Sequence, residues 1–293
     1  MVRGEPQKEL VHNTDWDILI IIDACRYDYF EKIHREALDD IGVLKKTLSP
    51  ATWTFGWHYE IFGDKKYNDI ILCSTTESIN SMCRTDLYIR DFAKRLKYQK
   101  FIGVNCWYKI IDVWKAWDDT FFHVHPKDVN RIGFDTIDKY PDKRVIIKYT
   151  QIHDPYLFYG GFFKKKTSQG RTKQKNTSKT IKFVAKYEKR LHKIFRKILT
   201  SEQQWVLSEK LGVLPQEGMG RLFLMYGWDG IRKGYTEDLK MVLKYVREII
   251  DRYPDKKIVI TADHGIILGE GGNIREGKKH PLIAQVPWYE VNL

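Results

Sequence analysis

The chain has 293 residues, of which 43% are hydrophobic, so it can bury a large core. No stretch reaches the roughly 18 to 20 uninterrupted apolar residues of a membrane-spanning helix, and the first residues lack the apolar core of a signal peptide, so a cytoplasmic location is expected. Four cysteines without CxxC spacing exclude a zinc ribbon and a disulfide-stapled secreted scaffold. The formal net charge of +12 favours an anionic small-molecule or polymeric substrate, although an excess of lysine also keeps proteins dispersed.

Short apolar segments alternate with helical or polar stretches along the chain. The run from Asp17 to Ile22 is continuous and apolar, as in a central strand of a parallel sheet that is buried on both faces. A helix is expected from about Tyr29 to Leu38, and the apolar spacing predicts two more at 184–198 and 239–249. The alternation predicts an α/β fold in which a mostly parallel central sheet carries helices on both faces. The further strand candidates are Val43–Leu48, Ile70–Cys73, Phe101–Asn105, Val145–Tyr149 and Ile258–Thr261.

One segment interrupts this alternation. Near residues 163–182 almost every residue is polar and many are lysines, so the segment cannot bury a core. It is interpreted as a basic, mobile surface insertion in a single domain that spans residues 1–293. Two roles stay open for it: a solvated loop, or an arm that covers the site or binds a polyanion such as nucleic acid. The sequence predicts no oligomeric state.

Polar residues that directly follow buried strands are the first candidates for function, because ligands of α/β sheets bind beyond the carboxyl ends of the strands. Asp23 ends the first apolar strand. A carboxylate there is costly without a cation or a donor, so metal ligation explains it, and capping of the next helix is the alternative. Asp263 and His264 follow the strand at 258–261, and an oxygen with an imidazole suits zinc, manganese or a similar divalent ion. His280 lies 16 residues beyond His264, across a glycine-rich loop that can fold back.

A third segment, from Ser49 to His58, passes from a strand into an expected helix at 55–62. A hydroxyl at the N-terminus of a helix lies beside free backbone amides, in a positive potential that favours an alkoxide and the anionic oxygens of a substrate. Thr52 and Thr54 both meet this condition. The alternative for either is a simple helix N-cap.

These three segments resemble the alkaline phosphatase/sulfatase superfamily in their order: an Asp after the first strand, a nucleophile at a helix start, and Asp-His-Gly near the C-terminus. Ile22-Asp-Ala-Cys-Arg-Tyr-Asp resembles the opening motif of the sulfatase-like branch, and Thr261-Ala-Asp-His-Gly with the later His-Pro and Val-Pro-Trp resembles its closing region. Thr54-Phe-Gly-Trp-His is similar to Thr-Phe-Pro-Asn-His of the nucleotide pyrophosphatase/phosphodiesterase branch, which selects Thr54 over Thr52. The Cys-x-Pro-x-Arg motif of true sulfatases has no counterpart near Thr54, so ordinary sulfatase chemistry is not indicated.

The resemblance implies an alkaline-phosphatase-like three-layer sandwich and a metal-dependent hydrolase that cleaves phosphate monoesters or diesters through a covalent Thr54 intermediate. The alternatives are a sulfatase-like hydrolase, a phosphotransferase, and a noncatalytic polyanion-binding protein on the same fold. One or two divalent ions are implied, zinc or manganese before magnesium or calcium. The implied metal ligands are Asp23, Thr54, Asp263, His264 and His280. The residues implied for a second metal or for substrate contact are His153, Asp154, His58 and Arg26, and for Arg26 a structural ion pair is the alternative.

Overall fold

The computed structural model describes residues 4–63, 65–82, 106–119, 123–163, 198–211 and 218–292. The expected strand at 101–105 lies outside these residues. Most of the basic insertion, from residue 164 onwards, also lies outside them, as does all but the last residue of the expected helix at 184–198.

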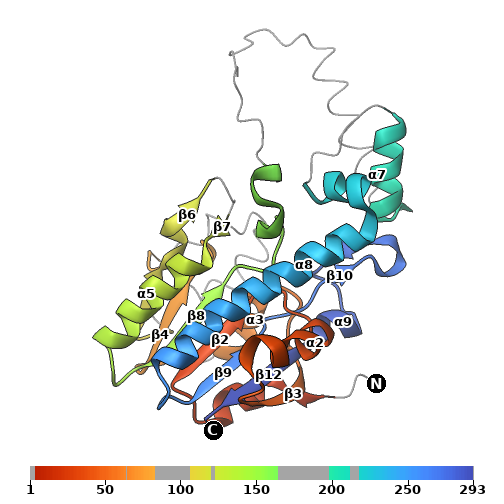
Figure 1. Ribbon diagram of the computed structural model, residues 1–293. Helices are drawn as coiled ribbons and strands as arrows, with labels where there is room; N and C mark the ends of the chain where they lie inside the picture. The colour runs from red at the N-terminus through yellow and green to blue at the C-terminus, as the bar shows by residue number, and fades with distance from the viewer. Residues whose placement is uncertain are drawn as a thin grey trace.

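An eight-stranded sheet forms the middle of the molecule (Figure 1). Neighbouring strands run parallel except at β12, which is antiparallel to both of its neighbours. The central strand β2 is buried along its whole length, which explains why its sequence is continuously apolar instead of alternating. In spatial order the strands are β1 (Glu5–Pro6), β3 (Val43–Leu48), β12 (Gln285–Val291), β9 (Ile258–Thr261), β2 (Ile18–Ile22), β8 (Arg144–Tyr149), β4 (Ile70–Ser74) and β5 (Lys109–Asp112).

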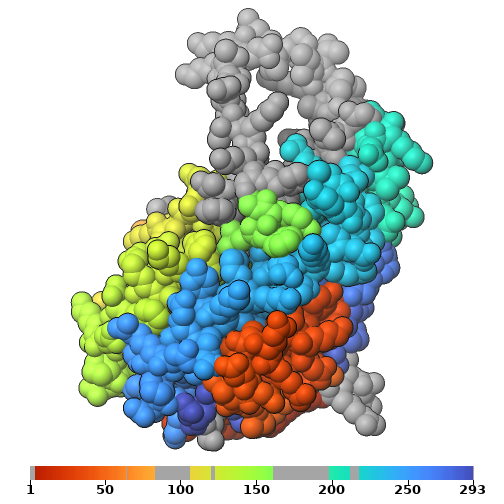
Figure 2. Space-filling view, viewed as in Figure 1, coloured from red at the N-terminus to blue at the C-terminus, as the bar shows by residue number. Residues whose placement is uncertain are grey.

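Helices cover both faces of this sheet. Alternate residues of β2 face two separate clusters of buried hydrophobic side chains, one on each face. The first cluster is closed by α2 (Tyr27–Leu38), α5 (Pro126–Lys139) and α8 (Gly218–Arg252), which form a continuous surface in Figure 2. The second is closed by α1 (Gln7–Asn13) and α3 (Thr54–Phe62). The predicted three-layer α/β sandwich with a mostly parallel sheet is therefore confirmed.

The C-terminal part of the chain departs from the sequence prediction in two ways. The last strand is β12, not the strand at 258–261, and it contains Pro287, a residue that sequence patterns rarely assign to an interior strand. The helix expected at 239–249 is the second half of α8, whose first half bends at Gly227 with a φ of 65°.

No helix within the described ranges is both long and apolar enough to cross a bilayer. The remaining elements are β6 (Trp117–Asp118), β7 (His123–Val124), β10 (Ile267–Leu268), β11 (Ile274–Arg275), α7 (Ser201–Lys210), α9 (Pro281–Ala284) and 3-10 turns at Val113–Ala116, Leu157–Phe163 and Glu270–Gly272.

Candidate metal centre

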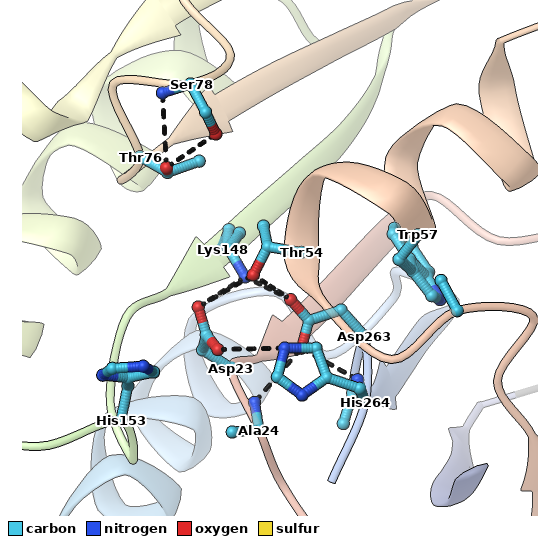
Figure 3. A network of polar contacts seen from close by, with 12 residues as sticks. Asp23, Ala24, Thr54, Trp57, Thr76, Ser78, Lys148, His153, Asp263 and His264 are labelled. Atoms are coloured by element: carbon cyan, nitrogen blue, oxygen red, sulfur yellow. Dashed lines mark hydrogen bonds and ion pairs between the residues drawn. The ribbon is translucent and has the colours of Figure 1, made fainter. Parts of the chain in front are cut away.

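The carboxyl ends of three neighbouring strands bring polar side chains together (Figure 3). Asp23 follows β2, while Asp263 and His264 come shortly after β9. Because β2 and β9 are parallel neighbours, these residues meet at one edge of the sheet. Their ligand atoms all lie within 4.8 Å of one another, and all three residues are buried. The structure thus gathers three of the predicted metal ligands.

Lys148, in the neighbouring strand β8, enters the same group, and sequence reasoning missed it. Its Nζ donates to Asp23 Oδ2 at 2.9 Å and to Asp263 Oδ2 at 2.8 Å, and its side chain is only 1% exposed. Burial alone would lower the pKa of Lys148, but the two carboxylates outweigh burial and raise it. Burial would likewise raise the pKa of Asp263, but Lys148 and His264 hold it well below its usual range. The site therefore contains a fixed ammonium between two carboxylates.

Thr54 lies at the start of α3 and faces the same carboxylates. Its Oγ1 donates to Asp263 Oδ2 at 2.7 Å and lies 3.3 Å from Asp23 Oδ2, the two oxygens that also accept from Lys148. The first backbone amides of a helix have no partner within the helix. The Thr54 hydroxyl is therefore placed beside an ammonium and a helix N-terminus, both of which favour negative charge on oxygen.

Gln7 holds α3 against the end of β9, a role that has no signal in the sequence pattern. Its Nε2 donates to Thr261 Oγ1 at 2.7 Å and to the Ala262 carbonyl at 2.8 Å. Its Oε1 accepts from Trp57 Nε1, also at 2.7 Å. This fully buried side chain fixes the helix that carries Thr54 relative to the strand that carries Asp263.

The glycine of Asp-His-Gly has a packing reason. A Cβ on Gly265 would lie 2.3 Å from the Leu282 carbonyl oxygen and 3.0 Å from Arg26 Cγ. The Gly265 amide also donates to the Ile283 carbonyl at 2.8 Å, so the two segments are locked at this distance. Only glycine allows the backbone after His264 to approach α9 this closely.

We therefore predict that Gly265→Ala lowers the melting temperature and weakens metal binding, because the backbone beside His264 must shift. The loss of stability should be about 1–3 kcal/mol, as for other overpacked positions. Thermal unfolding and calorimetric titration with Mn²⁺ measure the two effects. Gly271→Ala is the control, since its φ is 60° but the nearest atom to an added Cβ is 3.9 Å away. It should cost backbone strain and leave metal affinity unchanged, and an unchanged affinity in Gly265→Ala as well would contradict the prediction.

Two buried atoms of this group support a metal ion. Asp23 Oδ1 and His264 Nε2 have no hydrogen-bond partner among the described residues, and they lie 3.8 Å apart. Buried polar atoms are nearly always paired, so these two are expected to share a ligand. Burial opposes a charge on His264, but Asp263, Glu276 and Asp23 raise its pKa, so a positive charge is favoured here. The carboxylates and the imidazole therefore fit a divalent cation, without specifying which one.

Three other predicted residues have different partners. His280 Nδ1 accepts from the Leu282 amide at 3.2 Å and caps α9. The Arg26 guanidinium binds Asp28 at 2.7 Å and Glu270 at 2.6 Å, the structural ion pair that was the alternative for it. His58 is buried among aromatic rings, and burial lowers its pKa to about 3. None of these contacts places the three side chains among the metal ligands.

His153 and Asp154 come after β8 in the chain. Figure 3 shows His153 at the edge of the group. His153 Nδ1 lies 3.3 Å from Asp154 Oδ1, and its Nε2 lies 4.0 Å from Glu276 Oε2. Burial opposes a charge on His153, but Asp154, Asp23 and Glu276 raise its pKa to about 9. Positive charge is therefore favoured at the edge of the site as it is at His264, and both predicted roles, a second metal ligand or a substrate contact, stay predictions for His153 and Asp154.

No protein-family model matches the chain, and no curated protein matches it. Among solved structures, the soluble domain of lipooligosaccharide phosphoethanolamine transferase A from Neisseria meningitidis is similar at 10% identity with a TM-score of 0.47, covering 94% of this chain and 75% of that one. Two phosphonate monoester hydrolases are also similar. The one from Silicibacter pomeroyi has 13% identity and a TM-score of 0.48, covering 95% of this chain and 68% of that one. The one from Agrobacterium radiobacter has 10% identity and a TM-score of 0.47, covering 98% and 68%. At these identities and TM-scores the likeness to the three structures carries no argument about family or reaction.

Proposed function

We propose that this chain is a metal-dependent hydrolase of phosphate esters whose nucleophile is Thr54. The observation that carries the proposal is the direction of the Thr54 hydroxyl, which donates to Asp263 Oδ2 at 2.7 Å. A threonine kept only as a helix cap would bond to the first amides of α3. Instead Trp53 is the N-cap, and its own side chain makes no cap hydrogen bond to that helix. The hydroxyl is thus directed to the metal ligands and away from its own helix.

The residues around Thr54 would have different roles in the reaction. A bound divalent ion supplies positive charge for the nonbridging oxygens of the ester. Asp263 Oδ2 accepts the hydrogen bond of the Thr54 hydroxyl, so a lone pair of Oγ1 is free to face the substrate. Lys148 and the first amides of α3 stabilise negative charge as it develops at Oγ1. The bond from Oγ1 to phosphorus would form as the bond from phosphorus to the ester oxygen breaks, and the Thr54 proton, passed by way of Asp263 Oδ2, would end on the leaving alcohol. Water would then cleave the bond between Oγ1 and phosphorus, which restores the Thr54 hydroxyl and releases the phosphate product.

Three aryl substrates separate this proposal from its alternatives: an aryl phosphate, a bis-aryl phosphate and an aryl sulfate, each tested with Mn²⁺ or Zn²⁺ and with a chelator. We expect turnover of a phosphate ester that chelation abolishes. Faster turnover of the aryl sulfate would favour a sulfatase-like enzyme, and transfer to an added alcohol in preference to water would favour a phosphotransferase. A protein that binds metal and turns over none of the three would fit a noncatalytic role.

Asp263→Asn tests the metal site independently of turnover. The amide cannot bind a cation as a carboxylate does, so the affinity for Mn²⁺ should fall by about 100-fold or more, since losing even an outer partner of a metal ligand costs roughly 10- to 100-fold. The fold should survive, because the backbone amides of Ala24 and His264, which donate to Asp263 Oδ1, can donate to the Asn oxygen. Equal calorimetric affinity in variant and parent would remove Asp263 from the ligands.

A further inference from the structure

Glu276 reaches the metal centre from the glycine-rich loop. It directly follows β11, where Arg275 pairs with Ile267 of β10. On its other side the Gly277 amide donates to the Thr52 carbonyl at 2.9 Å, two residues before Thr54. The backbone of Glu276 is therefore fixed at both ends, and one of these anchors is the segment that carries the proposed nucleophile.

The carboxylate of Glu276 lacks the partner that a buried anion requires. Its Oε2 is buried, has no hydrogen-bond partner within the described part of the chain, and lies 3.5 Å from His264 Nε2. The side chain as a whole is 36% exposed, so it could turn into water, yet this oxygen faces inward. An inward, unpartnered carboxylate oxygen is unfavourable unless a cation or a donor completes it.

The hydrogen bond of the other His264 nitrogen shows what Glu276 faces. His264 Nδ1 lies 3.0 Å from the Gly265 carbonyl, which can only accept, so Nδ1 carries a proton. In the neutral ring Nε2 then presents a lone pair to Glu276 Oε2 and, at 3.8 Å, to Asp23 Oδ1. All three of these atoms lack a hydrogen-bond partner in the described structure. When the ring is neutral, these three acceptors converge and repel one another unless a cation lies between them.

We propose that Glu276 is a ligand of the metal ion together with Asp23 and His264. This inference rests on the metal site of the proposed function and adds a ligand to it from the glycine-rich loop. It also gives the site a third carboxylate beside one imidazole, a set rich in the hard oxygen ligands that suit Mn²⁺. Pairing of Glu276 with a protonated His153 or His264 is the competing explanation, and at 4.0 and 3.5 Å neither contact is a hydrogen bond.

Calorimetric titration with Mn²⁺ alone tests the inference in the full chain. Glu276→Gln should weaken Mn²⁺ binding by at least about 10- to 100-fold, which is the effect of losing a group that only supports a metal ligand. The melting temperature in chelator should stay the same or rise, because the variant removes a buried, unpartnered anion. Weaker Mn²⁺ binding with an unchanged or higher melting temperature indicates a lost ligand. A damaged fold would instead lower both the Mn²⁺ affinity and the melting temperature. The electron paramagnetic resonance spectrum of bound Mn²⁺ should also change, since the ligand set changes.

Glu270→Gln is the matched control from the same loop. Both oxygens of Glu270 already accept hydrogen bonds, Oε1 from Arg26 and Oε2 from the Leu268 amide, so neither lacks a partner as Glu276 Oε2 does. Its Mn²⁺ affinity should stay close to that of the parent. An affinity of Glu276→Gln within about twofold of the parent would overturn the inference and favour the ion pair with histidine.

The inference and the proposed function fail separately. If Mn²⁺ binding depends on Glu276 but no aryl ester is hydrolysed, the ligand assignment stands and the hydrolase proposal falls. If hydrolysis depends on metal but Glu276→Gln binds Mn²⁺ like the parent, the hydrolase proposal stands and the assignment of Glu276 as a ligand falls. A parent protein that binds neither Mn²⁺ nor Zn²⁺ would overturn both.

Discussion

Thr54→Ala should abolish turnover of the phosphate ester while the protein still binds its metal. The variant removes the attacking oxygen, and loss of a nucleophile lowers kcat by roughly 10⁴-fold or more in enzymes that use one. Asp23, Asp263 and His264 remain to hold the ion. Stability should fall by only about 1 kcal/mol, the usual value of the hydrogen bond that Oγ1 makes to Asp263. Steady-state kinetics, metal titration and thermal unfolding of one preparation measure all three effects.

Thr52→Ala is the matched control, two residues earlier in the same segment. The Thr52 carbonyl accepts from the Gly277 amide, and a backbone bond survives the change of side chain. Since the N-cap of α3 is Trp53 and not Thr52, the loss of stability should be below the roughly 1 kcal/mol of a lost N-cap. Rapid quenching of the parent with a phosphate ester, followed by peptide mass spectrometry, should place the phosphoryl group on Thr54. A phosphoryl group on Thr52, or full turnover by Thr54→Ala, would overturn the mechanism.

The residues that sequence reasoning found share a local signal. Asp23 and Asp263 each come just after a short apolar strand, and a parallel sheet brings such positions together whatever the rest of the chain does. Lys148 had only a weak signal, a lysine within an apolar strand. Whether this lysine reaches the site depends on the strand register, in which Lys148 pairs with Ile21, two residues before Asp23. The sequence of one strand alone does not predict that register.

The glycine-rich loop illustrates the same limit. Its glycines correctly predict a loop that can fold back, and a histidine beyond it, His280, was the natural choice of ligand. In the structure the loop does return, but Glu276 faces His264, while His280 caps α9. The difference is four residues, and it is decided by the pairing of β11 with β10 and by the bond from Gly277 to Thr52. The spacing of residues along the sequence does not predict such contacts between distant segments.

Replacing Lys148 should have opposite effects on stability and on metal affinity. In chelator, Lys148→Met leaves Asp23 and Asp263 buried without their ammonium, and breaking a buried ion pair on one side costs about 3–5 kcal/mol. With saturating metal the loss should be smaller, because the ion supplies positive charge to the same carboxylates. Metal affinity should rise, since Lys148 no longer competes for Asp263 Oδ2. Turnover should fall, because the charge beside Thr54 Oγ1 is lost.

Arg144→Met on the same strand is the control for this result. Arg144 pairs with Asp69 in a partly exposed ion pair, of the kind that contributes about 0–1 kcal/mol. Its removal should therefore lower stability little, and equally with metal and with chelator. Thermal unfolding of parent and both variants in each condition, with Mn²⁺ titrations, gives the comparison. An equal loss of stability for Lys148→Met with and without metal would mean that the ion does not bind the carboxylates that Lys148 bridges, and would move the metal away from Asp23 and Asp263.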